Sequence, residues 1–443
     1  MADTAPIPDV LVVGSGPAGA RVARDLARAG ARVSILEQGA GPSPGTNLLK
    51  LLRRKEAMQI APGVVLLRSL RVGGGSVTFY HTATPPPLGL FARHGVDLSH
   101  ALEQVLAELP HAPLRPDLLA PVVSRLMQAG QSLGLPWQPL PKMIDQSHCA
   151  LGACPPEAFW SSHELLQQAV KDGAHLHTGV QVLRVLFSQE NAGPPQVSLP
   201  PTGGGLGVAR PWGRSEGRAI GVEARSNGVL QTFRAGRVIL SAGGIASPAI
   251  LQHSGVAQAG DGFFCDPLRI VMGHVPIARS AQEISMSAGY FDADAGYMLS
   301  DITIPGNFFR AFTWAAGRPD QWLSFGHTAM IMVKIRDDIE GRIDARARPW
   351  RRFGPADKQR MQAGVAQARA VLRTAGAGKP YVSPWVAAHP GGSVRLGDMV
   401  DENLSCHSPN LHVCDASVIP ESWGLPPTLT LLALGAYLAQ RLS

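Results

Sequence analysis

Residues 10–37 read VLVVGSGPAGARVARDLARAGARVSILE, and this stretch decides the fold. An apolar run at residues 10–13 is followed by a glycine-rich turn and by a helical pattern that ends at Gly30. A second apolar run then ends in Glu37. The order of strand, glycine-rich turn, helix and strand, at close to minimal length, predicts a βαβ unit of Rossmann type.

The turn of this unit has the spacing of a dinucleotide fingerprint. Its glycines permit a tight turn and a close approach of the backbone to a pyrophosphate; they are Gly14, Gly16 and Gly19. Pro17 and Ala18 begin the helix, whose N-terminus attracts the anion. Glu37 lies where a carboxylate hydrogen-bonds a ribose hydroxyl and disfavours the 2′-phosphate of NADP. Because the fingerprint stands at the start of a long chain, we expect FAD rather than NAD.

Size and composition indicate a globular protein of two joined domains. The chain has 443 residues, of which 45% are hydrophobic and 16% charged. Its net charge of +7 is spread along the sequence without a block of like charges. We therefore expect a solvated surface or steering of anionic ligands, and no nucleic-acid partner.

Cysteines and apolar segments predict the compartment. Five cysteines cannot all pair, and the spacing of Cys149 and Cys154 fits no common zinc or redox pattern, so we expect reduced, buried thiols and no metal. No signal peptide is evident, and the apolar segment at residues 429–439 is too short to span a bilayer. These features predict a cytoplasmic protein without an integral membrane segment.

The remaining patterns predict an α/β protein with a discontinuous arrangement. Residues 1–95, 150–260 and 395–443 are expected to form the Rossmann-type FAD-binding domain, and residues 188–217, rich in proline and glycine, a mobile surface loop or an insert. Residues 96–149, mostly helical in pattern, and 261–394, with alternating runs, are expected to form a substrate domain on a mixed or antiparallel sheet with helices.

Three further segments, together with the first, resemble the glucose–methanol–choline oxidoreductase family. They are VGGGSVT at residues 72–78, SAGGIASPAILQHSG at residues 241–255, and the C-terminal run that begins with HPGGSVRLG at residues 389–397 and continues through LHVCDASVIP at residues 411–420 to Pro427 and Thr428. These landmarks follow the family's order from residue 9 to the C-terminus. The stretch at residues 149–161 resembles the long-chain alcohol oxidase and dehydrogenase members more loosely.

The resemblance implies which later residues hold FAD. It places the turn of Gly74, Gly75 and Ser76 against the flavin, and Asp415 and Ala416 at the diphosphate and ribityl chain. It also places the backbone of Val182 at the adenine. The remaining residues of the implied site come from the two later signatures; they are Ala242, Gly243, Pro427 and Thr428. Read without the family, Asp415 can also cap the turn that follows it.

Flavin-dependent oxidation of an alcohol requires a group that takes the hydroxyl proton. Histidine suits this task because its ordinary pKa is near neutral pH. His389 precedes Pro-Gly-Gly and matches the catalytic histidine of the family. The resemblance therefore implies hydride transfer from an alcohol to flavin N5 with His389 as the base, and either oxygen or a redox carrier as the electron acceptor.

The sequence departs from the family at the second polar position of the active site. Pro426 stands where relatives carry histidine or asparagine, and proline has no side-chain donor or acceptor. Trp423, Tyr80 and His81 are the candidates for the missing hydrogen bond. Phe79 replaces another polar residue, so we expect a hydrophobic small-molecule substrate. Residues 77 and 78, where some relatives attach FAD covalently, are not histidine, so we expect non-covalent FAD; the nearby Tyr80 and His81 leave a covalent link as the alternative.

Two other functions stay open at this stage. The flavin can serve a lyase, isomerase or decarboxylase reaction without net oxidation, which the proline at position 426 favours. The chain can also be a flavin-binding partner subunit without catalysis. Reduction of the flavin by alcohols separates the first function from both alternatives.

Overall fold

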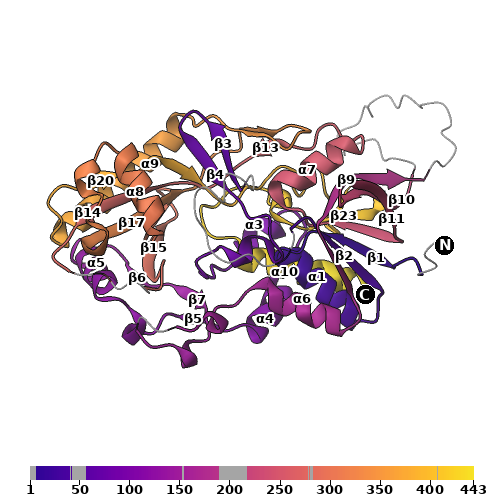
Figure 1. The fold of residues 1–443 in the computed structure, drawn as a ribbon, viewed down its shortest axis with the longest axis horizontal. Coiled ribbons are helices and arrows are strands. Elements are labelled where there is room, and N and C mark those ends of the chain that lie inside the picture. The colour runs from indigo at the N-terminus through magenta and orange to yellow at the C-terminus, as the bar shows by residue number, and fades with distance from the viewer. Residues whose placement is uncertain are drawn as a thin grey trace.

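The computed structural model describes residues 6–39, 41, 56–151, 154–188, 217–277, 279, 283–406 and 408–443. Nearly all of the stretch at residues 188–217, predicted to be a loop or an insert, lies outside these ranges. Two bodies built on separate sheets lie side by side along the long axis of the molecule (Figure 1). The C-terminus lies at the end that carries β1 (Figure 1).

The first body is the predicted Rossmann-type unit. Its sheet has the order β22-β23-β12-β1-β2-β8, and every pairing is parallel except that of β22 with β23. These strands are β1 (Val10–Val13), β2 (Val33–Glu37), β8 (His175–Thr178), β12 (Arg237–Leu240), β22 (Ser405–Cys406) and β23 (Ser408–Val413). The four residues of β1 are all buried, as expected for the inner strand of a covered parallel sheet.

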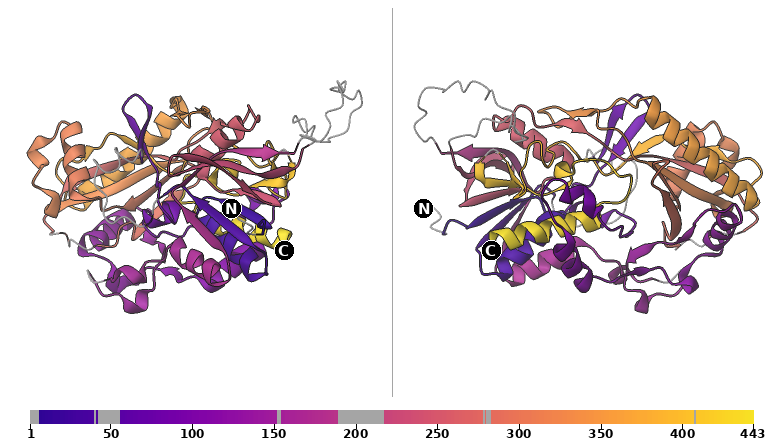
Figure 2. Two further views of the ribbon diagram at one scale, coloured as in Figure 1. Left: turned by 45° about the vertical axis from the view of Figure 1, so that its right-hand side comes forward. Right: turned by 180° about the vertical axis from the view of Figure 1, so that it is seen from behind.

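Helices from distant parts of the chain pack together on this sheet. Helix α1 (Pro17–Arg28) contacts both α6 (Ser162–Lys171) and the C-terminal helix α10 (Thr428–Leu442), and α10 contacts α4 (Ser99–Glu108). Figure 2 shows α10 lying alongside α1 and α6 when the molecule is seen from behind. The apolar segment at residues 429–439 is thus the buried face of a helix. In the described residues no helix has both the length and the apolar character needed to cross a membrane.

A three-stranded antiparallel sheet in the order β11-β10-β9 lies beside the parallel sheet, with contacts between β10 and β12. Its strands are β9 (Val180–Phe187), β10 (Ala219–Ser226) and β11 (Val229–Arg234). Helix α7 (Gly243–His253) follows β12 and packs against β9. The sequence SAGGIASP therefore forms the turn from strand to helix that was expected.

The second body is the predicted mixed sheet with covering helices. Its order is β3-β4-β21-β14-β17-β16-β15-β6, with β20 also paired to β14. These strands are β3 (Ala57–Ala61), β4 (Val64–Leu67), β6 (Gln138–Pro139), β14 (Pro267–His274), β15 (Ala288–Asp292), β16 (Tyr297–Asp301), β17 (Thr328–Ile335), β20 (Tyr381–Val382) and β21 (Trp385–Ala387). The β21–β4 pairing is parallel and the others are antiparallel, so the fold class is confirmed.

The central strand β17 is buried on both faces. Its residues Ile331 and Val333 belong to the core under α9 (Pro355–Thr374), whereas Met330 and Met332 belong to a separate core near α8 (Gly306–Ala315). Because side chains alternate along a strand, Lys334 shares the face of the two methionines. The other elements are α3 (Leu88–Ala92), α5 (Pro121–Ser132), β5 (His111–Pro113), β7 (Pro141–Met143), β13 (Asp261–Phe263), β18 (Gly341–Ile343) and β19 (Pro349–Trp350).

Packing divides the chain differently from the predicted domain boundaries in two places. Helix α4, expected in the substrate domain, contributes Ala101, Leu102 and Val105 to the core of the Rossmann body. Strands β3 and β4, expected in the FAD-binding domain, extend the large sheet. Residues 96–149 also contain strands β5, β6 and β7 besides their helices. Local periodicity identified the elements but not the body onto which each one packs.

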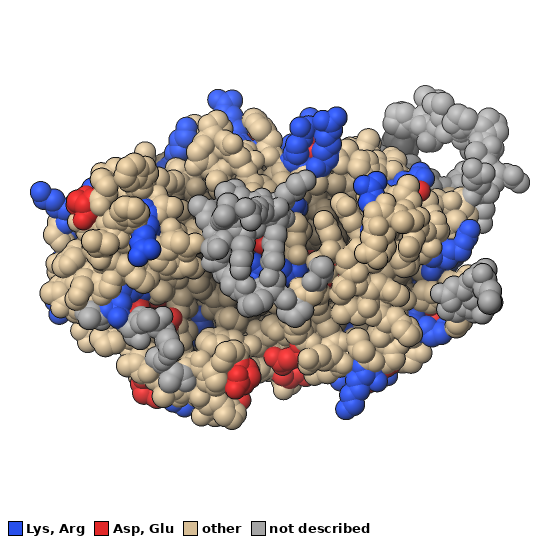
Figure 3. Space-filling model, in the orientation of Figure 1, with Lys and Arg blue, Asp and Glu red and all other residues tan. Residues whose placement is uncertain are grey.

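Two of the five cysteines are paired and three are buried thiols. Cys149 and Cys154 form a disulfide with a Cα–Cα distance of 4.3 Å, so the expectation of reduced thiols was wrong for this pair. Cys265, Cys406 and Cys414 are free and buried. On the face drawn in Figure 3, lysine and arginine side chains are dispersed over the surface. In the described residues no group of three or more His, Cys, Asp or Glu side chains is placed to hold a metal ion.

Candidate active site

A cavity of about 1330 Å³ runs between the Rossmann body and the large sheet. At one end it reaches the turn between β1 and α1, and at the other it reaches the faces of β14 and β17 and helix α8. The volume exceeds the roughly 300–1,000 Å³ that is usual for a small-molecule site. The cavity is thus large enough for a dinucleotide and a substrate together.

The glycine-rich end of the cavity is shaped for close approach of a ligand to the backbone. Gly14 has φ +102°, and a side chain there would collide with the carbonyl of Ser241. A Cβ added at Gly74 would lie 2.8 Å from the Cα of Gly16, so these two turns touch. A Cβ added at Gly16 or Gly75 would meet no protein atom within 4 Å, and both residues line the cavity. The missing side chains therefore leave room for a ligand at the N-terminus of α1, and this geometry fits a pyrophosphate.

Glu37 lines the same end of the cavity. Its side chain accepts hydrogen bonds from the backbone N–H of Ser15 (3.0 Å), the hydroxyl of Ser15 (2.5 Å) and the backbone N–H of Gly39 (2.6 Å). These donors fix the carboxylate at the C-terminal end of β2, where it lines the cavity. The carboxylate is thus preorganised at the position expected for a ribose.

Asp415 joins three segments of the site. It accepts hydrogen bonds from the backbone N–H of Ser417 (2.8 Å), the backbone N–H of Gly243 (2.8 Å) and the hydroxyl of Ser247 (2.5 Å). It therefore caps the turn that follows it and also holds the start of α7, and it lines the cavity. Burial raises the pKa of its carboxyl, and these hydrogen bonds oppose that shift.

The structure brings the predicted cofactor residues to one cavity with two exceptions. Gly19 and Ser76 do not line it. Gly19 lies against Gly14 and Ser241, where a side chain would collide with the backbone, so it permits close packing of α1. Ser76 donates to the carbonyl of Gly73 (2.6 Å) and accepts from the backbone N–H of Ser162 (3.0 Å), which holds the turn in place.

His389 lies at the junction of the two bodies, directly after β21. Its Nδ1 lies 3.1 Å from Oδ2 of Asp266, and its side chain is 28% exposed toward the cavity that it lines. Both residues have positive φ, +51° for His389 and +39° for Asp266, which is uncommon for residues other than glycine. Backbone strain of this kind is found at functional sites where the surrounding structure fixes one geometry. The expected base is thus held by a carboxylate that the sequence did not identify.

Lys334 is the third member of this cluster. Its Nζ lies 3.5 Å from Nδ1 of His389 and 3.7 Å from Oδ2 of Asp266, and its side chain is 1% exposed. Burial lowers the pKa of Lys334 to about 8, an effect that Asp266 opposes. Burial, followed by the charge of Lys334, lowers the pKa of His389, and Asp266 opposes this shift. Burial and Lys334 thus favour the neutral imidazole, which can accept a proton.

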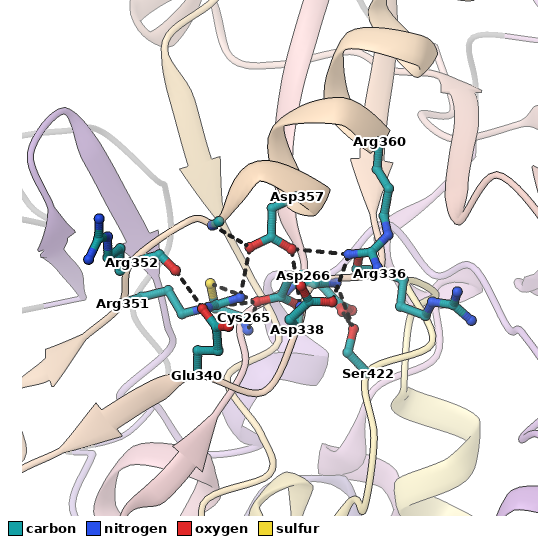
Figure 4. Close-up of polar contacts among 12 residues, drawn as sticks. Cys265, Asp266, Arg336, Asp338, Glu340, Arg351, Arg352, Asp357, Arg360 and Ser422 are labelled. Carbon is teal, nitrogen blue, oxygen red and sulfur yellow. Dashed lines mark hydrogen bonds and ion pairs between the residues drawn. The ribbon is translucent and has the colours of Figure 1, made fainter.

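A buried network supports Asp266 from behind (Figure 4). Oδ1 of Asp266 accepts a hydrogen bond from the hydroxyl of Ser422 (2.8 Å), and the backbone N–H of Asp266 donates to Asp337 (3.0 Å). Arg351, whose side chain is fully buried, contacts Asp337 (3.3 Å) and Asp357 (2.9 Å). Burial and the nearby charge of Asp266 raise the pKa of Asp337 to about 7. The network fixes the orientation of the Asp266 carboxylate toward His389.

The three residues considered for the missing hydrogen bond are placed differently. Tyr80 lines the cavity, as does Pro426, but Trp423 and His81 do not. Trp423 packs against Phe91 with ring centroids 6.2 Å apart. The ring of His81 packs against aromatic rings, and burial lowers its pKa to about 3. Lys334, whose Nζ lies 3.5 Å from Nδ1 of His389, is instead a further polar group beside the histidine, and it was not among the predicted site residues.

The end of the cavity beyond His389 is mainly apolar. It is lined by Leu268, Ile270, Met286, Ile302, Ile304, Phe308, Phe312, Phe325 and Met332. These side chains come from β14 and β17, from α8 and from the loops next to them. Such a lining favours the apolar part of a substrate, whereas His389 and Lys334 at its inner end can meet a polar group.

Family models account for most of this architecture. The model described as GMC oxidoreductase matches in two parts, residues 96–277 for the N-terminal part and residues 340–435 for the C-terminal part, which together exceed half of the chain. The chain belongs to the GMC oxidoreductase family. An FAD binding domain model also matches residues 8–48, which contain the glycine-rich turn and Glu37. FAD is the cofactor.

Two curated relatives of this GMC oxidoreductase are long-chain-alcohol oxidases of Arabidopsis thaliana. Each is 22% identical, over alignments of 522 and 521 residues that cover 98% of this chain and 68% and 66% of the plant enzymes. An uncharacterized GMC-type oxidoreductase of Mycobacterium tuberculosis is 30% identical over 314 residues, which are 65% of this chain and 43% of that protein. The chain thus spans about two thirds of the plant enzymes and less than half of the mycobacterial protein.

Solved structures show the same fold. Pyridoxine 4-oxidase from Mesorbium loti matches with a TM-score of 0.72 and 16% identity, covering 98% of this chain and 99% of the other. A formate oxidase variant of Aspergillus oryzae matches with a TM-score of 0.70 and 17% identity, covering 99% and 98%. At these identities the likeness concerns the fold, and the substrate must be argued from the cavity.

Proposed function

We propose that this GMC oxidoreductase oxidises a hydrophobic alcohol, with His389 taking the hydroxyl proton. One observation carries the proposal: His389 lies between the cofactor end and the apolar end of a single cavity, with its Nδ1 held 3.1 Å from Asp266. When bound, FAD accepts the hydride from the carbinol carbon. The residues of the chain bind the alcohol, orient it and receive its proton.

The Asp266–His389 pair supports a base with a defined tautomer. The hydroxyl oxygen of Ser422 accepts a hydrogen bond from the backbone N–H of Asp337 (3.3 Å). The hydroxyl hydrogen of Ser422 is therefore directed to Oδ1 of Asp266. Oδ2 of Asp266 is left to accept the Nδ1–H of His389, which places the lone pair on Nε2. A neutral imidazole in this tautomer accepts the hydroxyl proton at Nε2 as the hydride leaves.

The apolar lining supports a substrate with an aliphatic or aromatic body. Phe308 and Phe312 of α8 line the cavity together with Met332 of β17. Removing their apolar surface from water by contact with a substrate stabilises the complex by roughly 25 cal/mol per Å². Two relatives are named long-chain-alcohol oxidases, which agrees with an alcohol of this kind. We propose a primary or secondary alcohol with an extended apolar chain, and oxygen or a redox carrier as the final acceptor.

Pro426 is the observation that favours a second function, a reaction without net oxidation. Because it lines the cavity without a polar side chain, a reaction without net oxidation, such as a lyase or decarboxylase reaction, remains the alternative. The Asp266–His389 pair favours the oxidation, because loss of a hydride from the carbinol carbon requires a base that takes the hydroxyl proton.

Anaerobic mixing of the holoenzyme with alcohols of increasing chain length tests this function. The proposal predicts loss of the visible absorbance of the flavin, formation of one aldehyde or ketone per flavin, and faster reduction by long-chain than by short-chain alcohols. Product formation without loss of absorbance would support the alternative. An unreactive flavin with every alcohol would refute the proposal.

A further inference from the structure

Lys334 is an unusual residue for its place in the fold. It lies in β17, the central strand of the large sheet, where all eight residues of the strand are buried. Its side chain shares a face with Met330 and Met332 and lines the cavity beside His389. A lysine in an apolar strand interior is costly unless its charge is paired, so its retention calls for a physical reason.

The contacts of the ammonium group indicate that it acts by charge. The 3.7 Å to Oδ2 of Asp266 exceeds the 2.7–3.2 Å that is usual for an N–H···O hydrogen bond, and the 3.5 Å to the ring nitrogen Nδ1 of His389 is also long. When Nδ1 of His389 donates to Asp266, it has no lone pair left for Lys334. The lysine therefore does not orient the imidazole by hydrogen bonding, and its influence on the imidazole is electrostatic.

We infer that Lys334 is a positioning residue that keeps His389 neutral, so that a fixed carboxylate can orient the base without protonating it. This inference rests on the proposed function. Asp266 alone would favour the imidazolium, which cannot accept a proton. The ammonium beside both groups offsets the carboxylate charge and disfavours a second positive charge on the ring.

Among the charged groups around His389, Lys334 is the one that disfavours the imidazolium. Asp337 accepts the backbone N–H of Asp266, and Arg351 pairs with Asp337 and Asp357. Figure 4 shows Arg351 directed toward Asp357. The groups that act on the pKa of His389 from neighbouring elements are Lys334 of β17, which lowers it, and Asp266 before β14, which raises it. Because burial already lowers this pKa, both burial and Lys334 act in the direction that a base requires.

The first test is the pH dependence of flavin reduction by a saturating alcohol in Lys334→Met, a neutral substitution of similar length. A carboxylate beside an opposite charge at about 4–6 Å has its pKa shifted by about one to three units, and a like charge acts on the imidazole in the opposite sense, so the acid limb should move upward by about one unit when the ammonium is removed. Lys334→Arg, which retains the charge, should keep the limb of the wild-type enzyme. An unmoved limb in Lys334→Met would overturn the inference.

The chain offers a matched control in Lys142, a second fully buried lysine. Its Nζ is instead directed to the carbonyls of Tyr80, Ser285 (2.9 Å) and Met286 (3.3 Å) and to the hydroxyl of Thr82 (3.2 Å). Lys142→Met should therefore leave the acid limb in place, whatever it does to stability. An equal shift in both variants would attribute the effect to loosening of the fold and overturn the inference.

A measurement on the wild-type holoenzyme covers the case in which Lys334→Met does not fold. In protein labelled with ¹⁵N-histidine, the signal of His389, assigned by its loss in His389→Gln, should report a neutral ring protonated on Nδ1 at pH 6.5. A half-protonated ring at or above that pH would overturn the inference. This readout does not depend on turnover, so a half-protonated ring would overturn the inference even if no alcohol reduces the flavin and the proposed function fails.

Discussion

Replacing Asp266 by asparagine removes one charge from the candidate site with little change in shape. The hydroxyl of Ser422 must donate to the position of Oδ1, so the amide oxygen of the asparagine takes that position. The amide NH₂ then faces Nδ1 of His389, which has to accept a hydrogen bond and carries its proton on Nε2 instead. The substitution thus blocks the nitrogen that is expected to receive the hydroxyl proton.

The size of this effect follows from the charge-assisted hydrogen bond that stabilises the reactive tautomer and that the asparagine cannot make. A hydrogen bond to a charged group contributes about 1.5–3 kcal/mol. At 1.36 kcal/mol for each tenfold change in rate, its loss corresponds to a decrease of roughly 10- to 150-fold in the rate of flavin reduction. This range applies to the hydrogen bond between His389 and Asp266, because its length of 3.1 Å is normal and the histidine is largely shielded from water.

Stopped-flow measurement of flavin reduction under anaerobic conditions gives the rate of this step directly. The variant should retain its flavin and its thermal unfolding midpoint should be measured alongside, so that a rate loss is not confused with unfolding. A rate within twofold of the wild-type enzyme would show that Asp266 does not fix the tautomer of His389.

Three further outcomes follow from the same geometry. Gly16→Val fills the space left open at the N-terminus of α1, so the purified variant should lose its yellow colour, and a fully coloured variant would contradict the proposed pyrophosphate position. Phe312→Ala removes an apolar wall, so kcat/KM should fall about tenfold for alcohols long enough to reach it and stay unchanged for short ones. Arg351→Met leaves the buried Asp337 without its cation and Asp357 with Arg360 alone (3.2 Å), and it should destabilise the fold by about 3–5 kcal/mol in urea unfolding, whereas a change below 1 kcal/mol would mean that the network relaxes.

The pH dependence of the wild-type enzyme follows from the sign of one shift. Burial and Lys334 lower the pKa of His389 below its ordinary value of 6.5. The neutral form, which accepts a proton, is therefore populated above the lowered pKa and is lost as the pH falls through it. The acid limb of kcat/KM should lie below pH 6.5, and a limb near or above pH 7 would contradict this assignment.

Short-range patterns in the sequence predicted the residues that lie on glycine-rich turns. Gly14, Gly16 and Glu37 belong to one local βαβ unit, so their spacing alone places them together. His389 stands out because of the Pro-Gly-Gly that follows it. The fold class was predictable for the same reason, since each element shows its own periodicity over a few residues.

Long-range contacts explain what the sequence did not reveal. Asp266 and His389 are separated by 123 positions and meet only because β14 pairs with β21. Lys334 could have been found, since a single lysine in the apolar run of residues 328–335 is a signal in itself. Trp423 and His81 were placed in the site by proximity along the chain, but both side chains pack into apolar surroundings instead.

The rate of flavin reduction in His389→Ala tests the central claim most directly. In a single anaerobic turnover with a long-chain alcohol, the account predicts a reduction rate about 10² or more below that of the wild-type enzyme, with FAD still bound and the alcohol still binding. An unchanged rate in a variant that keeps its flavin would remove His389 as the base and contradict the account.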